Sequence, residues 1–353
     1  RSHPQIAEAI LKARAALPDR LATADAEALV VRFDPDQYNG NATLAENILF
    51  GTPRKPGYAA EALAENRLMT QVLTDAGLID DMLRMGLSIA RTMVEIFAGL
   101  PPGHPFFAQF SFIDADSLPE YRNALTKVDR QGEKALTPAE SLALRGLPFA
   151  YVEARHRLGL IDETIEARAV EARRLFAERL AESDPDALAI YRPDAYNAAA
   201  TLQDNILFGR LAYGQAKAEE IVGRAMTEVL DTLGLRETVV LAGLDYGVGV
   251  GGKRLTATQR QKIGLARALL KQPDLLIVND ALAAMDDAAQ TRLLGKTLDY
   301  RKDRGVIWTL QRPRAGERFD RLIVLRGGRL VEQGSFADLS RPGSALSGIL
   351  AAE

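Results

Sequence analysis

The stretch that decides the fold is RLTATQRQKIGLARALLKQPDLLIVND, residues 254–280. Its first part is rich in strong helix formers, and its apolar residues recur at the spacing of one helical face. Its last part, DLLIVND (274–280), is an apolar run with β-branched residues, which is typical of a buried parallel strand. The stretch therefore predicts a helix followed directly by a buried strand.

The residues that follow continue this alternation of helix and strand. AAQTRLLGKTLDYRKDRG (288–305) has the pattern of an amphipathic helix, and VIWTL (306–310) predicts a second buried strand. RLIVLRGGRLVEQG (321–334) has two strand-like runs around Gly327 and Gly328, which favours a hairpin with a type I′ turn. The order helix, strand, helix, strand, hairpin predicts the closing half of an α/β fold with high helix content.

The composition is that of an ordinary globular protein and excludes several classes of function. The chain has 353 residues, of which 47% are hydrophobic and 26% charged, with a formal net charge of -3. The absence of a basic excess argues against nucleic acid or an anionic membrane surface as a partner. The absence of cysteine excludes disulfides, thiolate ligands for zinc and thiol catalysis.

The most apolar long segment, residues 82–100, carries Arg84, Arg91 and Glu95 at helical spacing. It predicts an amphipathic helix, because a membrane span needs about 20 mostly apolar residues. The sequence begins RSHPQIAEAI, without an initiator Met or an apolar signal region. We expect the chain to be a piece of a longer polypeptide.

One segment of the sequence occurs twice. YNGNATLAENILFGTP begins at Tyr38, and YNAAATLQDNILFGRL begins at Tyr196, 158 residues later. MTQVLTDAGL begins at Met69, and MTEVLDTLGL begins at Met226, 157 residues later. Similarity at a nearly constant offset over this length indicates an internal repeat.

The repeat divides the chain into three parts. We expect the first copy in residues 1–88, a helical insert in 89–164, and the second copy with an α/β core in 165–353. Each copy predicts a helix, a short strand that Pro35 or Pro193 stops, and then two helices.

A structural repeat carries a further expectation about the two NILFG segments. Both should end a helix in the same turn, with Gly51 and Gly209 as the C-caps. Different backbone conformations at these two glycines would contradict a structural repeat.

The insert has two candidate helix starts with capping-box spacing. These are Ser117 with Glu120, and Thr137, followed by a proline, with Glu140. The aromatic cluster in LPPGHPFFAQFSF (100–112) is interpreted as a small hydrophobic core, with a binding surface as the alternative.

A glycine-rich stretch, YGVGVGGKRLTATQ (246–259), matches two phosphate-binding patterns. A phosphate loop needs Ser or Thr after its lysine to bind Mg²⁺, but Arg254 stands there. A dinucleotide fingerprint needs an acidic residue about 20 positions further on. Asn279 and Asp280 lie 27 and 28 positions beyond Gly252. We therefore reject both interpretations of this stretch.

Several segments, taken in order, resemble the ATP-binding cassette (ABC) domain of exporters. Residues 200–209 resemble the segment after the Q-loop, and 247–286 resemble the run from the signature motif through Walker B to the D-loop. Residues 305–313 resemble the strand of the switch histidine, and 317–339 the closing hairpin and helix. The resemblance implies the closing half of a P-loop, ABC-type nucleotide-binding domain. The helical insert matches nothing in ordinary cassette domains.

The signature motif, usually LSGGQ in this family, stands here as LTATQ. In the family it begins a helix that approaches the γ-phosphate across a dimer. The helix N-terminus is kept, so weak anion binding is expected, but loss of both glycines hinders close backbone approach. The five positions are Leu255, Thr256, Ala257, Thr258 and Gln259.

The remaining family positions are also altered. Walker B ends in Asn279 and Asp280 in place of Asp and Glu, so Asn279 offers only a neutral oxygen to Mg²⁺. Asp280 is assigned the orientation or deprotonation of water, one methylene short of the usual Glu. The D-loop keeps Asp286. Gln311 stands at the switch histidine, where it donates a hydrogen bond but does not titrate near neutral pH.

The chain contains no G-x-x-x-x-G-K-[ST] motif, so the resemblance implies an ABC module without its Walker A. We expect it to couple ATP binding and hydrolysis to transport only when another segment supplies that loop. By itself, the chain is expected not to hydrolyse ATP. The alternative is a non-hydrolytic interaction or regulatory module that keeps the cassette fold.

The resemblance also implies ligands, partners and location. ATP and Mg²⁺ are the implied cofactors, bound weakly or not at all by this chain alone. The implied partners are a transmembrane domain and a second cassette domain, with no nucleic acid. The implied location is cytoplasmic, at the inner face of the membrane, through a transmembrane domain outside this chain.

Overall fold

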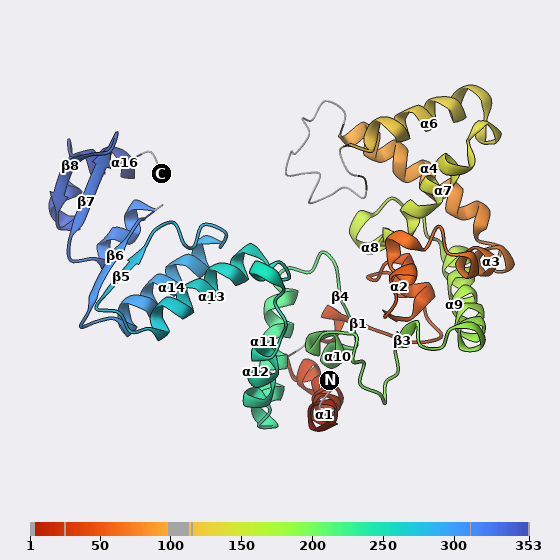
Figure 1. Cartoon of the computed structure of the whole chain (residues 1–353), viewed down its shortest axis with the longest axis horizontal. Coiled ribbons are helices and arrows are strands. Elements are labelled where there is room, and N and C mark those ends of the chain that lie inside the picture. Colours follow the sequence, from red (N-terminus) through yellow and green to blue (C-terminus); the bar gives the residue numbers. More distant parts are fainter. Residues whose placement is uncertain (1–3, 25, 98–112, 114–115, 311, 352–353) are drawn as a thin grey trace. The chain divides into compact units, whose positions relative to one another are not determined.

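The computed structural model describes residues 4–24, 26–97, 113, 116–310 and 312–351 (Figure 1). They form two compact units, Arg1–Leu244 and Asp245–Glu353. The described residues are mostly helical, and the short strands pair in twos. Each unit has hydrophobic clusters of its own.

In the first unit, the two similar segments contain the same order of elements: a long helix, a short strand, a short helix and a second short strand. Each short helix begins at a threonine cap, Thr43 or Thr201, whose side chain accepts a backbone N–H of the first turn. The elements are α1 (Pro4–Thr23), β1 (Val30–Arg32), α2 (Leu44–Leu49) and β2 (Gly51–Pro53), then α9 (Glu163–Ser183), β3 (Leu188–Ile190), α10 (Leu202–Leu207) and β4 (Gly209–Leu211).

The strands of each segment pair with those of the other segment. β1 is antiparallel to β4, with Val30 opposite Leu211, and β2 is antiparallel to β3, with Gly51 opposite Ile190. The helices follow the strands, because α1 packs on α10 and α9 packs on α2. The helix and strand that begin each segment therefore pack on the short helix and the second strand of the other segment.

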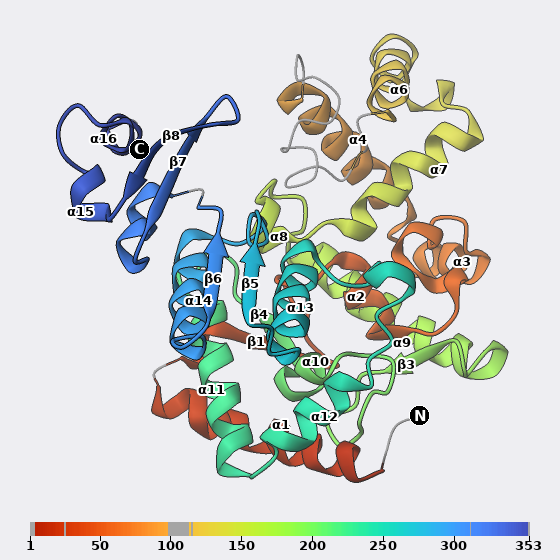
Figure 2. The same cartoon turned by 60° about the vertical axis from the view of Figure 1, so that its left-hand side comes forward.

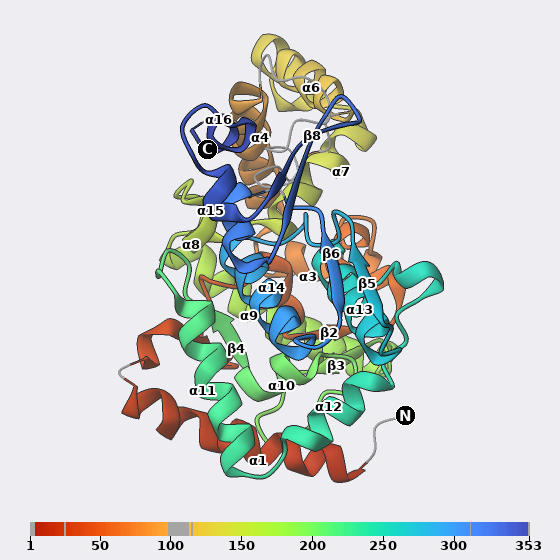
Figure 3. The ribbon, with the colours of Figure 1, turned by 90° about the vertical axis from the view of Figure 1, so that its left-hand side faces the viewer.

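The rest of the first unit is helical. α1 also packs against α11, beside which it lies in Figure 3. α4 buries Met82, Met85, Ile89 and Met93, which confirms the amphipathic helix predicted for this segment. The elements are η1 (Glu27–Leu29), η2 (Pro56–Tyr58), η3 (Ala60–Ala62), α3 (Arg67–Asp75), α4 (Ile79–Ile96), α6 (Leu118–Gln131), η4 (Glu133–Ala135), α7 (Pro138–Gly146), η5 (Leu147–Ala150), α8 (Glu153–His156), α11 (Ala218–Thr232) and α12 (Arg236–Leu244).

Both NILFG segments end their helices in the same turn, as predicted, but the cap residue differs from the prediction. Phe50 and Phe208 adopt the left-handed conformation, with φ of 43° and 45°. Gly51 and Gly209 are instead the first residues of β2 and β4. A Cβ on Gly51 would lie 2.8 Å from the Ala189 oxygen. Glycine is needed here for the close approach of the other segment's strand.

The predictions for the insert have mixed outcomes. Thr137 and Glu140 form the predicted capping box at the start of α7. α6 begins after Ser117, as expected, but Ser117 has helical backbone angles (φ −84°, ψ −15°) rather than the extended conformation of a capping residue. The aromatic cluster at 100–112 lies outside the described residues.

The second unit has the predicted order of elements. β5 and β6 form a parallel pair next to α13 and α14 (Figure 2), and β7 and β8 form an antiparallel hairpin. Gly327 and Gly328 have φ of 58° and 75°, which agrees with the predicted type I′ turn. The elements are η6 (Val250–Gly252), α13 (Ala257–Leu270), β5 (Leu275–Val278), α14 (Asp287–Tyr300), β6 (Gly305–Trp308), η7 (Pro313–Arg318), β7 (Leu322–Arg326), β8 (Arg329–Gly334), α15 (Phe336–Leu339) and α16 (Ala345–Leu350).

The prediction that both parallel strands are buried is wrong for one of their faces. Leu276 and Val278 are buried in a cluster with residues of α13 and α14. On the opposite face, Leu275, Ile277 and Ile307 are 49%, 64% and 54% exposed. Exposed and buried residues alternate along β5 because successive side chains on a strand point to opposite faces.

Among the helices that the structure describes, none combines the length and the apolar character that crossing a membrane requires.

Candidate functional site

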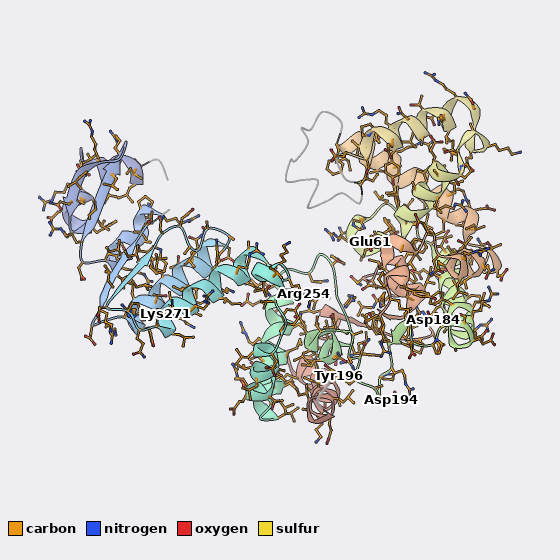
Figure 4. All side chains as sticks on the ribbon, in the orientation of Figure 1. Glu61, Asp184, Asp194, Tyr196, Arg254 and Lys271 are labelled. Carbon is orange, nitrogen blue, oxygen red and sulfur yellow. The ribbon has the colours of Figure 1, made fainter. Side chains whose placement is uncertain are left out.

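The predicted signature residues form the beginning of α13. Thr256 is the N-cap, and its hydroxyl accepts the Gln259 backbone N–H at 3.2 Å. The Gln259 side-chain oxygen accepts the Thr256 backbone N–H at 2.9 Å, which completes a capping box. Figure 4 labels Arg254 and Lys271, which flank the two ends of this helix. Thr256 and Gln259 thus stabilise the helix start with groups that could otherwise contact a ligand.

The start of α13 is hydrogen-bonded to the segment that precedes α14. The Thr258 hydroxyl donates to the Ala284 carbonyl oxygen at 2.8 Å, and the Ala284 N–H donates to the Gln261 side-chain oxygen at 3.0 Å. Asp286 is the N-cap of α14, where its carboxylate accepts the Ala289 N–H at 2.7 Å. The structure therefore brings the predicted signature and D-loop segments together, through Thr258 and Gln261 rather than through Asp286.

The predicted Walker B residues lie at the end of β5. The Thr309 hydroxyl, just beyond β6, donates to the Asn279 side-chain oxygen at 2.8 Å. Asp280 has a φ of 50°, a left-handed conformation that Asp tolerates better than most residues. Asp280 and Thr309 both line a cavity of about 40 Å³, together with Trp308. Gln311, predicted at the switch position, lies outside the described residues.

These residues do not fit a complete site for a magnesium nucleotide. The cavity of about 40 Å³ compares with the roughly 300 Å³ or more of a small-molecule site. The oxygen that Asn279 could offer to Mg²⁺ already accepts a hydrogen bond from Thr309. Within the described part of the chain, no group of three or more His, Cys, Asp or Glu side chains is placed to hold a metal ion.

Two residues of this site, Gln261 and Thr309, escaped the sequence analysis. Gln261 lies in the middle of a helical run, and Thr309 follows the apolar strand that precedes the predicted switch position. Neither belongs to a recognisable motif, so only the contacts with Ala284 and Asn279 reveal their roles.

Part of the chain is similar to proteins whose names describe them as ATP-dependent or ATP-binding. It is 35% identical over 148 residues to the ATP-dependent lipid A-core flippase of Burkholderia pseudomallei, covering 40% of this chain and 24% of the flippase. It is 29% identical over 140 residues to the glutathione/L-cysteine transport system ATP-binding/permease protein CydC of Escherichia coli, covering 40% and 23%. It is 32% identical over 153 residues to the heterocyst differentiation ATP-binding protein HepA of Nostoc sp., covering 43% and 24%.

These relatives support the resemblance to the ATP-binding cassette family. The chain spans about a quarter of the length of the curated relatives it matches. No family model and no solved structure matches the chain.

Proposed function

We propose that residues 245–353 are the closing part of an exporter-type ATP-binding cassette module. The order of α13, β5, α14, β6 and the β7–β8 hairpin supports this proposal. The similarity of part of the chain to the flippase and to CydC also supports it. In this proposal the site is degenerate and does not hydrolyse ATP by itself.

The observation that carries the proposal is the exposed apolar face of the β5–β6 pair. Parallel sheets are nearly always covered on both faces. Here Leu275, Ile277 and Ile307 are about half exposed or more, while Leu276 and Val278 are buried on the other face. We infer that further elements of a cassette, including its Walker A, cover this face from another segment or another polypeptide.

The completed module would couple the binding and hydrolysis of ATP, with Mg²⁺, to transport. Its partners would be a transmembrane domain and a second cassette domain, and it would lie at the cytoplasmic face of a membrane. Asn279 and the side chains that cap α13 would make its site weaker than one with a full set of family residues. This proposal retains Asp280, Gln311 and Asp286 in their predicted roles.

Measurements of MgATP binding and phosphate release test the proposal. We compare the chain alone with a polypeptide that continues upstream into a Walker A, and each with its Asn279→Asp variant. We expect activity only in the extended form, and more of it with Asn279→Asp because a carboxylate binds Mg²⁺ better than an amide. Thr309→Val, which removes only the hydroxyl partner of Asn279, is the matched control. Hydrolysis by the chain alone would overturn the proposal.

A second function is favoured by hydrogen bonds at the start of α13 and at the end of β5. Thr256, Thr258 and Asn279 use their side chains to hold the fold together. This arrangement suits a non-hydrolytic interaction or regulatory module. An absence of any ATP effect in both the chain and its extended form would favour this second function.

We also propose that the first unit arose by duplication, with the first copy in residues 1–88, an insert at 89–164, and the second copy at the beginning of the part 165–353 that also holds the α/β core. The shared order of elements and the shared turn at Phe50 and Phe208 support this division.

A further inference from the structure

The two similar segments of the first unit each consist of an arm and a body. The first arm is residues 4–32 and the second arm is residues 163–190. The first body is residues 44–96 and the second body is residues 202–244. Each arm contributes a helix and a strand to the other segment's body, through the β1–β4 and β2–β3 pairs and the α1–α10 and α2–α9 contacts.

Arg14 of the first arm fixes that arm to the second segment. Its side chain donates to the Asn205 carbonyl oxygen at 2.7 Å and to the Asn205 side-chain oxygen at 3.1 Å. It also donates to three carbonyl oxygens of the loop 192–195 at 2.8, 2.9 and 3.1 Å. The guanidinium lies 4.6 Å from the centre of the Phe208 ring. Figure 4 labels Asp194, which belongs to this loop, and Tyr196, which directly follows it.

Arg173 of the second arm makes the equivalent contacts with the first segment. It donates to the Asn47 carbonyl oxygen at 2.7 Å and to the Asn47 side-chain oxygen at 3.3 Å. It donates to three carbonyl oxygens of the loop 34–37 at 2.8, 2.5 and 3.0 Å. Its guanidinium lies 4.4 Å from the centre of the Phe50 ring. Both arginines are buried. A buried guanidinium costs free energy unless acceptors meet its N–H groups, so these contacts both stabilise the arm and fix its position.

Four aromatic rings meet where the two segments cross. Phe33 and Tyr191, at equivalent positions, are stacked with ring centres 4.4 Å apart and planes 10° apart. Phe50 and Phe208, also equivalent, lie edge-on to Phe33 at 6.1 and 5.8 Å. The strand pairs, the arginines and the rings therefore all obey one pseudo-twofold relation, as the subunits of a symmetric dimer do.

We propose that the second body is a docking site for the first arm of a second copy of this chain, so that two chains associate by exchanging arms. An arm from another chain makes the same strand pair, the same Arg14 contacts and the same helix packing as the arm within the chain. The two forms differ mainly in effective concentration, which is of millimolar order for a tethered segment. Exchange is therefore expected when chains refold together at high concentration.

Engineered disulfides first test the pairing within one chain, because the chain has no cysteine of its own. Val31 is opposite Arg210 in the β1–β4 pair. If each arm packed on the body of its own segment, Val31 would instead face Thr52, which is equivalent to Arg210. We expect an intrachain disulfide in the double variant Val31→Cys with Arg210→Cys. Its formation only in Val31→Cys with Thr52→Cys would overturn the proposal.

Mixing two single variants then tests association between chains. Val31→Cys chains are unfolded, mixed with Arg210→Cys chains and refolded together, and covalent heterodimer is measured on a non-reducing gel. Val31→Cys chains refolded alone set the background. We expect heterodimer well above that background, with a yield that rises with chain concentration. A yield at background, with a competent intrachain pair, would overturn the proposal.

The role of Arg14 in docking has its own matched control. Arg14→Met in the Val31→Cys chain weakens docking of the arm within the chain and between chains alike, because the contacts are the same. It should therefore leave the share of heterodimer unchanged and lower the midpoint of urea unfolding. Lys12→Met, on an exposed position of the same helix, should leave both unchanged. If Arg14→Met does not refold, Arg14→Lys keeps the charge and removes the fork, and should also lower the midpoint. A midpoint equal to that of Lys12→Met would contradict the role of Arg14.

Discussion

At the scale of single residues, Arg14 and Arg173 show how carbonyl oxygens and an aromatic ring can hold a buried positive charge. The Arg173 guanidinium donates to carbonyl oxygens of one loop and of α2, and lies over an aromatic ring. Burial lowers the pKa of Arg173 to about 10, which leaves the side chain charged at neutral pH. The partial negative charges of several carbonyl groups offset the cost of burying that charge.

The first prediction concerns Arg173. Arg173→Met should lower the free energy of unfolding by about 3 kcal/mol, because it leaves several buried carbonyl oxygens without a donor. Arg174→Met is the control, since Arg174 is exposed and its ion pairs within the described part of the chain are with Glu171 and Glu178 of its own helix. Urea unfolding followed by circular dichroism measures both. Equal midpoints for the two variants would contradict the assignment.

The second prediction concerns His156 in α8. Its Nδ1 atom accepts the Val152 backbone N–H at 2.9 Å. Burial, with Arg155 nearby, lowers the pKa of His156 to about 4. The unfolded chain, with a pKa near 6.5, therefore binds the proton more tightly, and the free energy of unfolding should fall as the pH drops from about 6.5 towards 4.

His156→Asn tests this pH dependence, because the Asn side-chain oxygen can replace Nδ1 as an acceptor and does not titrate. The variant should lose less stability than the unmodified protein between pH 6.5 and 4, with similar stability at pH 8. Thermal unfolding across this range measures the difference. Parallel curves for the two proteins would show that His156 does not carry the effect.

At the scale of elements, the pairing of three-residue strands depends on residues far away in the sequence. A Cβ on Gly209 would lie 2.5 Å from the Val31 oxygen and 2.9 Å from the Arg32 Cα atom. The observed spacing of the β1–β4 pair therefore requires a residue without a side chain at this position.

The third prediction uses two glycines with opposite expected effects. Gly209→Ala should destabilise the protein by about 1–3 kcal/mol, because the strand backbones must move apart. Gly223→Ala lies inside α11, where a Cβ meets open space, and should stabilise the protein by up to about 1 kcal/mol. Chemical unfolding of both variants measures these changes. A neutral Gly209→Ala would contradict the close approach of β1 and β4.

The elements that the sequence predicts well are those with local signals. The helix at 257–270, the hairpin around Gly327 and the capping box at Thr137 follow from periodicity, turn residues and cap spacing. β2 (GTP) and β4 (GRL) were not predicted, because they lack the apolar run that marks β1 and β3 and are defined by a partner more than 130 residues away. The same partner explains why glycine follows the C-cap at Phe50 instead of forming it.

In the candidate site, too, the positions of residues in the fold were predicted, but their contacts were not. The family resemblance placed Thr256 at a helix start and Asn279 and Asp280 at a strand end, where the structure has them. Their hydrogen-bond partners could not be predicted, because the Asn279 partner lies 30 residues further along the chain. The exposed face of the β5–β6 pair was also not predicted, since an apolar run does not show which of its faces is covered.

At the scale of the whole molecule, each unit has its own hydrophobic clusters, and the second unit exposes the apolar face of the β5–β6 pair. Apolar patches of this kind in soluble proteins mark binding surfaces or sites of aggregation. Large apolar side chains on both strands contribute to the patch, so a single polar substitution should change its properties measurably.

The fourth prediction tests this face. Ile277→Lys should reduce binding of a hydrophobic dye and reduce light scattering at high concentration, with little change in the unfolding midpoint. Val278→Lys, one residue away on the buried face, should unfold the second unit, because it buries a charge. Dye fluorescence and thermal unfolding measure both. A large loss of stability in Ile277→Lys would show that this face is covered in the folded chain.

The arms of the first unit also have a consequence for biosynthesis. The first arm ends at residue 32, but its partner helices α10 and α11 end only at residues 207 and 232. At a synthesis rate of about 5–20 residues per second, the arm emerges some 10–40 s before its docking surface is complete. During that time the apolar side of α1, with Ile10, Leu17 and Leu21, has no body to cover it. The nascent chain should therefore bind chaperones once α1 has emerged, and release them once α11 has left the ribosome.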